Sequence, residues 1–188
     1  LSTTFFGDTI NVSSTDYYGN SRPYPADTNP DMGAIENNLG TPIIITYVVN
    51  KDGTGDFTSI QSAINTALSF EHILVMPGDY TENIDFTGKN IVVKSSGGPT
   101  VTSISPSFYS DMIKFDNNET SSTVLDGFTL KNGYNSNRGI LISDSSPTIK
   151  NCIFTNCANN DVIYFENSSS KIINCLFENN VGDNVFSF

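Results

Sequence analysis

The chain is poor in several residue types that other protein classes depend on. Its 188 residues include no tryptophan, three cysteines and one histidine, His72. Three cysteines cannot pair completely, which excludes the disulfide framework of small secreted domains. A Cys–His or Ser–His relay would have to use His72, which directly precedes the apolar run ILVM. We therefore expect a structural or surface role for this histidine.

Positive charge is also scarce. Nine Lys plus Arg against twenty Asp plus Glu give a net charge of −11, and the basic residues are scattered. No positive stripe is available to neutralise phosphates, so nucleic acid and anionic membranes are not expected partners. The sequence also lacks an apolar run long enough to span a bilayer, which argues against membrane insertion.

The N-terminus lacks the features of a natural start. Leu1 is neither a start methionine nor part of a charged signal region, so we expect the natural chain to begin earlier. Abundant Asn, Ser and Thr, together with 13 Phe and 8 Tyr, favour a β-rich extracellular or cell-surface protein.

A short pattern returns three times in the last third of the chain, at nearly equal intervals. It reads LDGFTLKNG from Leu125 to Gly133, IKNCIFTNC from Ile149 to Cys157, and IINCLFENN from Ile172 to Asn180. Such a unit has short β-type runs and polar corners but no helical stripe, and it can bury its apolar face only by stacking on copies of itself. The pattern predicts an all-β parallel solenoid.

Stacked coils should place equivalent residues in columns. Two apolar columns are predicted to lie in the core: Phe128, Cys152 and Cys175, and Leu130, Phe154 and Phe177. Asn132, Asn156 and Asn179 would form a side-chain ladder, although Asn is also common in turns. We expect stacked thiols rather than a disulfide, because side chains in register run parallel to each other. Cys157 is predicted to be a buried small residue.

The solenoid is predicted to occupy residues 45–188, beginning with a cap helix. Within TSIQSAINTAL, apolar residues recur at helical spacing, and this predicts one helix from Ser59 to Leu68. A helix laid over the first coil would cover its exposed strand edges. The preceding residues are rich in Pro, Gly and Asn, which indicates a loop-rich region over 1–36 and a linker over 37–44.

The repeats resemble those of a known family. SSPTIKNCIFTNC and GFTLKNG are similar to the repeats of right-handed parallel β-helix proteins, the pectin-lyase-like fold, and particularly of large bacterial secreted or surface proteins. VVNKDGTGDFTSIQSAINTA, from Val48 to Ala67, resembles the capped first coil of pectin esterases. This resemblance implies a right-handed β-helix from an extracellular or cell-surface protein of bacterial origin.

A second resemblance concerns the start of the chain. The segment from Asp16 to Glu36, with YYGNSRP and DMGAIE, is similar to the closing segment of such β-helices. It implies that residues 1–36 close a preceding β-helix and that residues 45–188 begin another, which would continue beyond residue 188. Neighbouring β-helix domains or subunits would then be partners.

No set of catalytic residues stands out. An enzyme of this fold that cleaves polysaccharides would need converging carboxylates. The pectin esterase motifs GxVDFIFG and GRPW do not occur, and Asp161 in NDVIYFEN has no carboxylate partner in the pattern. We interpret Asp52 and Asp56 as turn and cap residues. The sequence predicts no catalytic residue and no resident cofactor.

One segment has a weak resemblance to a calcium loop. Asp27, Asn29 and Asp31 supply alternating oxygen ligands, but Met32 and Asn38 stand where such a loop places Gly and a bidentate Glu. The alternative is an ordinary turn rich in Asp and Asn.

Two functions remain open from the sequence. The first is a structural or adhesive extracellular β-helix module of a larger surface protein or filament, which could also bind glycans and would not itself be an enzyme. The alternative is a fragment of a carbohydrate-active enzyme, similar to pectin esterases or polysaccharide lyases, whose catalytic coils lie outside this chain. The fold alone does not distinguish them.

Overall fold

A computed structural model of the chain describes residues 2–5, 8–11, 44, 46–133, 138–157, 161–181 and 184–188. The chain divides into two compact units, residues 1–43 and residues 44–188. In the first unit, β1 (Ser2–Phe5) and β2 (Asp8–Asn11) form an antiparallel pair. The predicted closing segment, the calcium candidate Asp27, Asn29 and Asp31, and nearly all of the linker lie outside the described residues, so these assignments stay predictions.

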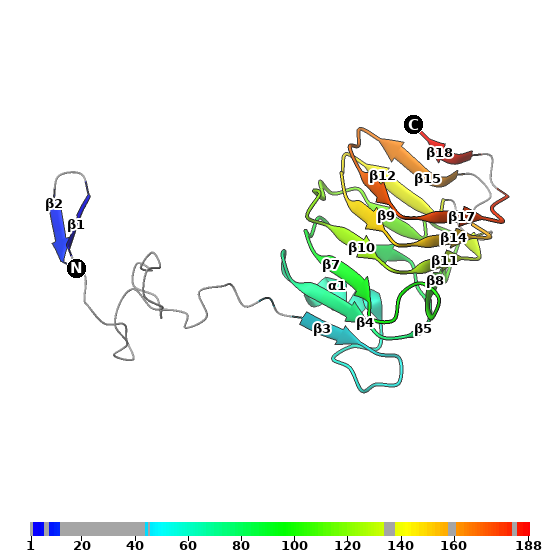
Figure 1. The fold of residues 1–188 in the computed structure, drawn as a ribbon, viewed down its shortest axis with the longest axis horizontal. Coiled ribbons are helices and arrows are strands. Elements are labelled where there is room, and N and C mark those ends of the chain that lie inside the picture. The colour runs from blue at the N-terminus through cyan, green and yellow to red at the C-terminus, as the bar shows by residue number, and fades with distance from the viewer. Residues whose placement is uncertain are drawn as a thin grey trace. The chain divides into compact units, whose positions relative to one another are not determined.

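The second unit is a stack of coils with three parallel sheets along its sides (Figure 1). The first sheet contains β3 (Thr46–Val49), β4 (His72–Val75), β7 (Val92–Ser95), β10 (Val124–Asp126), β13 (Thr148–Lys150) and β16 (Lys171–Ile173). The second contains β5 (Gly78–Thr81), β8 (Thr102–Ser105), β11 (Thr129–Lys131), β14 (Ile153–Thr155) and β17 (Leu176–Glu178). The third contains β6 (Ile84–Asp85), β9 (Ile113–Phe115), β12 (Ile140–Ser143), β15 (Asp161–Glu166) and β18 (Asn184–Ser187). From β4 onward each coil contributes one strand to each sheet, which confirms the predicted all-β parallel solenoid.

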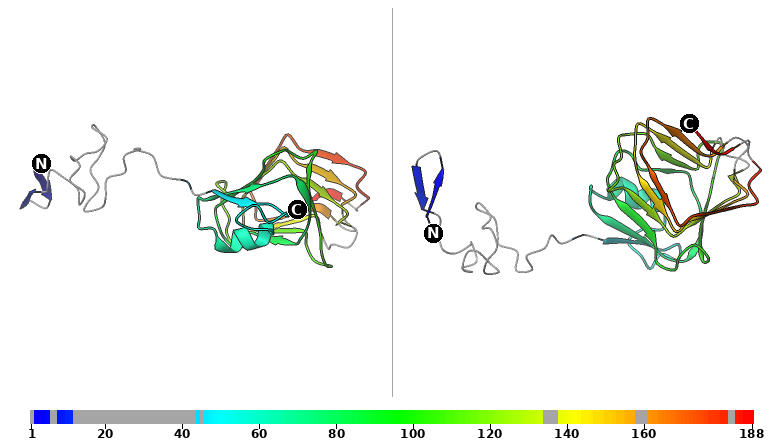
Figure 2. Two further views of the ribbon diagram at one scale, coloured as in Figure 1. Left: turned by 90° about the horizontal axis from the view of Figure 1, so that it is seen from below. Right: turned by 45° about the horizontal axis from the view of Figure 1, so that its top comes forward.

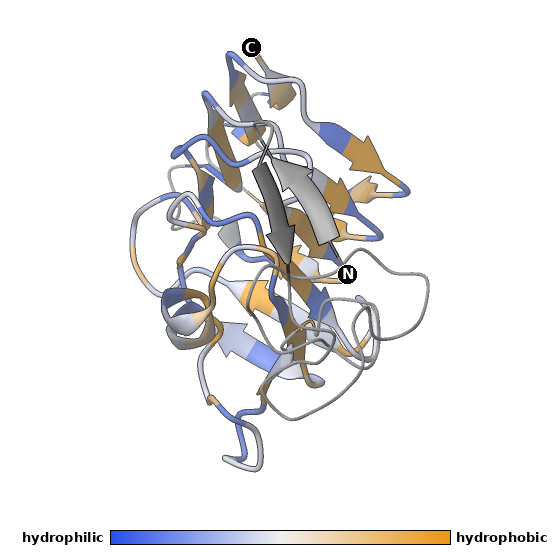
Figure 3. Ribbon diagram, turned by 90° about the vertical axis from the view of Figure 1, so that its left-hand side faces the viewer, coloured by the Kyte–Doolittle hydropathy of each residue, from blue (hydrophilic) through white to orange (hydrophobic). Residues whose placement is uncertain are grey.

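The register agrees with the repeat seen in the sequence. Leu125 pairs with Ile149, which pairs with Ile172 in the next coil. Because the side chains of a strand alternate between its two faces, this pairing keeps every inward residue inward through successive coils. Figure 3 shows hydrophobic and hydrophilic residues mixed along the strands, as this alternation requires.

The predicted core columns are confirmed. Phe128 and Cys152 are fully buried, and Cys175 is half-buried against the same core. In the second column, the rings of Phe154 and Phe177 stack with centroids 4.6 Å apart and planes 7° apart. Aromatic rings stacked between coils add to the stabilisation from burial alone.

One helix, α1 (Ile60–Thr66), lies at the end of the solenoid where the first coils begin (Figure 2). Ser59 is the N-cap, and its hydroxyl accepts a hydrogen bond from the backbone amide of Ser62 at 3.3 Å. The helix ends at Thr66, short of the predicted end at Leu68, because Ala67 already has an extended ψ of 144°. Leu68, predicted to extend the apolar face, is instead 69% exposed.

The carboxylate of Glu82, from the first coil, anchors the start of α1. Its oxygens accept hydrogen bonds from the hydroxyl of Ser59 at 2.8 Å and from the backbone amides of Ile60 and Gln61 at 3.0 Å each. A carboxylate at this position satisfies first-turn amides that have no partner within the helix and complements the helix dipole. The bonds fix the helix to the coil that it covers.

Asparagines form the corners of the coils. Asn132, Asn156 and Asn179 have φ values of 60°, 50° and 54°, in the left-handed region where Asn is favoured over most residues. The turn interpretation therefore explains these positions. A side-chain ladder runs along a neighbouring corner, where Asn174 Nδ2 donates to Asn151 Oδ1 at 2.8 Å.

Candidate ligand-binding face

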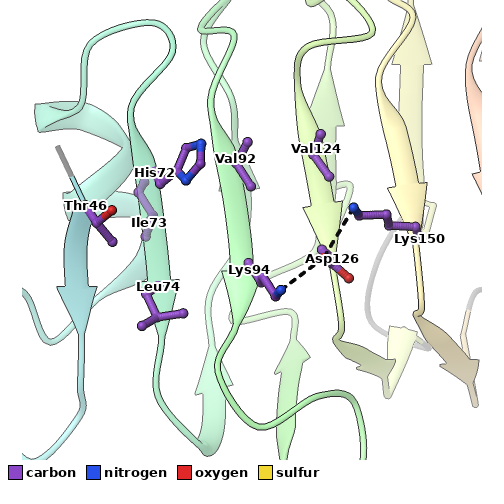
Figure 4. Close-up of a pocket in the computed structure, with 9 residues that line it drawn as sticks. All are labelled: Thr46, His72, Ile73, Leu74, Val92, Lys94, Val124, Asp126 and Lys150. Atoms are coloured by element: carbon purple, nitrogen blue, oxygen red, sulfur yellow. Dashed lines mark ion pairs between the residues drawn. The ribbon is translucent and has the colours of Figure 1, made fainter. Parts of the chain in front are cut away.

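A groove of about 360 Å³ runs across the outer face of the first sheet (Figure 4). On β4, Ile73 and Val75 are buried in the core, so that His72 and Leu74 face outward. The same alternation on the neighbouring strands produces two rows of outward side chains. These rows are Thr46, His72, Val92 and Val124, and Leu74, Lys94, Asp126 and Lys150.

A carboxylate between two lysines forms the centre of the second row. Asp126 pairs in register with Lys94 on one side and Lys150 on the other. Its Oδ2 lies 3.9 Å from the Nζ of Lys94 and 3.5 Å from the Nζ of Lys150, the two contacts drawn in Figure 4. Its Oδ1 accepts a hydrogen bond from Asn151 Nδ2 at 2.7 Å. The ladder at Asn151 and Asn174 thus ends on this carboxylate.

These contacts assign Asp126 a positioning role. Asp126 is only 6% exposed. Its Oδ2 faces the two lysine ammonium groups, and its Oδ1 accepts the hydrogen bond from Asn151. A general base needs a free oxygen directed at the substrate. Asp126 instead holds two ammonium groups at the floor of the groove, where the side chain of Lys94 is 58% exposed.

The rest of the groove is mostly apolar. Val92, Val124 and Leu74 offer side-chain surface, and the imidazole of His72 lies beside Val92 in Figure 4. His72 is half-buried on this outer face, in agreement with the surface role expected from the sequence. Apolar surface with a few well-placed polar groups is typical of ligand sites.

The first sheet is positively charged on its outside although the protein is strongly acidic. The outward residues of its described strands include Lys94, Lys150 and Lys171 but a single acidic residue, Asp126. The chain as a whole has a net charge of −11. A local excess of positive charge on this face attracts anionic groups.

The third sheet has basic residues that are paired with acids. On the third sheet, Lys114 Nζ lies 2.7 Å from Asp116 and 3.6 Å from Asp85, and the hydrogen bond with Asp116 raises the pKa of Lys114. The guanidinium of Arg138 lies 3.6 Å from Asp111. Among the described residues, this face therefore has no comparable excess of positive charge.

The second sheet has an ion pair of this kind. Lys131 Nζ lies 2.7 Å from Asp79 Oδ1, which also accepts a hydrogen bond from the hydroxyl of Ser103. The hydrogen bond from Lys131, followed by that from Ser103, lowers the pKa of Asp79. Thus Lys131 is neutralised locally, unlike Lys94 and Lys150, which share a single carboxylate.

The other acidic residues considered from the sequence have structural contacts. Asp52 Oδ1 accepts hydrogen bonds from Thr54 within its turn, and Asp56 Oδ2 accepts one from the amide of Val48 at 2.8 Å. Asp161 Oδ1 accepts one from Asn184 in the next coil at 3.3 Å. Within the ranges that the structure describes, no three His, Cys, Asp or Glu residues are grouped as metal ligands.

These features define the class of the protein. Residues 81–187 match the family described as the right handed beta helix region, which is more than half of the chain. The chain belongs to this family, and its solenoid is a right-handed β-helix. Its described helix is too short to cross a membrane. A search of curated proteins finds no match.

The sequence reasoning missed the charged row. The interval from Lys94 to Asp126 is longer than that from Asp126 to Lys150, so that the second interval fits the repeat and the first does not. A signal was present, because the strands NIVVK, TVLD and PTIK can be aligned by their β-branched residues without regard to the lengths between them.

Proposed function

We propose that this β-helix is a non-catalytic binding module of a bacterial extracellular or cell-surface protein, and that it binds an extended glycan along the outer face of the first sheet. The observation that carries the proposal is the paired-lysine row of Lys94, Asp126 and Lys150 in an otherwise acidic chain. The composition, rich in uncharged polar residues, supports the proposed location.

The row holds its two positive charges close together. Lys94 and Lys150 lie on the strands either side of β10, but their Nζ atoms lie 3.9 Å and 3.5 Å from the same oxygen, Asp126 Oδ2, so the two ammonium groups are no farther apart than the sum of these distances. An extended chain with repeated carboxylate or sulfate groups could meet both. The apolar row beside them would contact the faces of its sugar rings.

The alternative function is a carbohydrate-active enzyme with catalytic coils outside this chain. On the face proposed here, the one carboxylate is held between two lysines and an amide, which supports binding over proton transfer. The resemblance of Asp16–Glu36 to a closing segment supports neighbouring β-helix domains or subunits as further partners in an adhesive or filamentous assembly.

Glycan binding by the full chain tests the proposal. We expect polyuronate and sulfated glycans to bind without turnover and to bind more weakly as salt rises. Replacing both Lys94 and Lys150 by Gln should weaken binding about tenfold, since each partly exposed charge contributes roughly 0.5–1 kcal/mol. The matched control is the double change Lys114→Gln and Lys131→Gln, which removes the same two charges from the third and second sheets and should leave binding unchanged.

Two results would contradict the proposal. Absence of binding to any glycan, with the chain shown to be folded by circular dichroism, would refute glycan recognition. Depolymerisation of a bound glycan that survives repurification would favour the enzyme.

A further inference from the structure

Two of the three cysteines lie directly above one another in consecutive coils. Ile153 and Leu176 pair in parallel register, and the residues just before them are Cys152 and Cys175. The backbone amide of Leu176 donates to the carbonyl of Cys152 at 2.9 Å, which fixes the two corners at one strand spacing. Both side chains belong to the same inward column, and both are free thiols.

The two thiols influence each other chemically. The interaction between the neighbouring thiols lowers the pKa of Cys175 to about 7 and, together with burial, raises that of Cys152. Each thiol also donates to a backbone carbonyl, Cys152 Sγ to Lys150 at 3.2 Å and Cys175 Sγ to Ile173 at 3.4 Å. A thiolate is the reactive form of cysteine. At neutral pH, therefore, Cys175 combines a substantial thiolate fraction with a second thiol as its immediate neighbour.

We propose that Cys152 and Cys175 are an oxidation site that forms a reversible disulfide between consecutive coils in the presence of a peroxide. The Cys175 thiolate attacks one peroxide oxygen and breaks the O–O bond, which gives a sulfenic acid and, after protonation, water. The sulfur of Cys152 then displaces hydroxide from the sulfenic acid, and the proton lost by Cys152 converts that hydroxide to a second water. The peroxide is reduced by two electrons, and the two thiols are oxidised to one disulfide.

The geometry is compatible with this bond after a small local movement. Strand neighbours lie about 4.8 Å apart, within the Cα separation of roughly 4.4–6.8 Å that disulfides span, whereas their Cβ atoms need to approach to about 3.8 Å. Asn151 and Asn174, which precede the two cysteines, both have positive φ, so the thiols lie at corners rather than within strands. The bond therefore requires the two Cβ atoms to approach by about 1 Å at this corner, from one strand spacing to the disulfide distance.

The third cysteine provides an internal control. Cys157 is fully buried, and burial raises the pKa of its thiol to about 12. Its equivalent in the next coil is Asn180, whose Oδ1 accepts a hydrogen bond from the Cys157 backbone amide at 2.9 Å. Among the described residues, Cys157 therefore has no thiol stacked on it and should not take part.

The test treats the folded full chain with hydrogen peroxide and counts thiols under denaturing, non-reducing conditions. We expect the count to fall from three to one in a monomeric chain that has lost two hydrogens, and to return to three with dithiothreitol. Cys157→Ser should retain the cross-link, and Cys152→Ser and Cys175→Ser should each abolish it.

A second measurement keeps the proposal falsifiable if a variant folds poorly. The rate of Cys175 alkylation by iodoacetamide should titrate near pH 7 in the native chain and shift toward higher pH in Cys152→Ser. Loss of the cross-link in folded Cys157→Ser, a disulfide only between chains, irreversible sulfinic acid in its place, or an unchanged alkylation profile would each overturn the proposal.

Discussion

The carboxylate of Glu119 is predicted to connect three successive coils at one corner, and its removal tests that arrangement. Glu119 is 1% exposed. Its Oε1 accepts a hydrogen bond from the amide of Gly88 at 2.8 Å, and its Oε2 accepts from the amide of Asn117 at 3.0 Å and from the hydroxyl of Ser145 at 2.8 Å. The three donors lie at corners of three successive coils, so the substitution Glu119→Ala should remove a link between these corners.

The magnitude follows from these contacts. Hydrogen bonds to a charged group contribute about 1.5–3 kcal/mol each, but burying the carboxylate offsets part of that sum. After substitution, two backbone amides would be left without this acceptor, each at a cost of about 1–3 kcal/mol. We therefore expect Glu119→Ala to lower the free energy of unfolding by about 3 kcal/mol. For a chain of this size that corresponds to a fall in Tm of about 6–12 °C.

Thermal and urea unfolding followed by circular dichroism would measure the loss, because the chain has no tryptophan. Amide hydrogen exchange should also accelerate at Gly88 and Asn117 in the variant. The control is Glu166→Gln, since Glu166 is exposed and accepts one hydrogen bond from Ser143 at 2.9 Å. It should change the free energy of unfolding by less than about 0.5 kcal/mol. Equal Tm values for Glu119→Ala and the control would refute the reasoning.

Three further changes test the packing and the charges. Phe154→Ala removes a fully buried ring from the aromatic column and should cost about 3–5 kcal/mol in urea unfolding; a loss below about 1 kcal/mol would contradict its burial. Gly139→Ala would place a Cβ 2.4 Å from the carbonyl oxygen of Val162 and should cost about 1–3 kcal/mol, and an unchanged Tm would argue against this close approach. Lys131→Ala should raise the pKa of Asp79 back toward 3.8 in an NMR titration. In the native chain, the contribution of Asp79 to the free energy of unfolding is complete above pH 3.8 and is lost as the pH falls through the lowered pKa of the folded state.

The fold was predictable because the coils repeat in the sequence. Phe128, Cys152 and Cys175 occupy the predicted column, since parallel in-register pairing converts a constant interval into a constant position. The cap helix was also predictable from its spacing, but its end was not. Leu68 continues the apolar pattern, yet the chain turns at Ala67 to reach β4.

The candidate ligand face could not be predicted in the same way. Lys94 and Asp126 become neighbours only because β7 and β10 pair, and a longer coil separates them along the chain. Glu82 and Glu119 likewise appear as ordinary acidic residues until the stack brings the amides of other coils to them. Tertiary contacts of this kind leave no local periodicity in the sequence.

The coils differ in length, but their strands pair in the same register. Along the first sheet, the chain takes a much longer path from Val92 to Val124 than from His72 to Val92, and the strands still pair in register. The extra residues leave the stack at corners such as the loop between β8 and β9, where Asn83 Oδ1 accepts hydrogen bonds from the amides of Ser107 at 2.9 Å and Phe108 at 3.2 Å. Insertions and deletions at these corners can therefore accumulate over evolution, and foreign peptides can be grafted there, while the lattice of strands keeps its alignment.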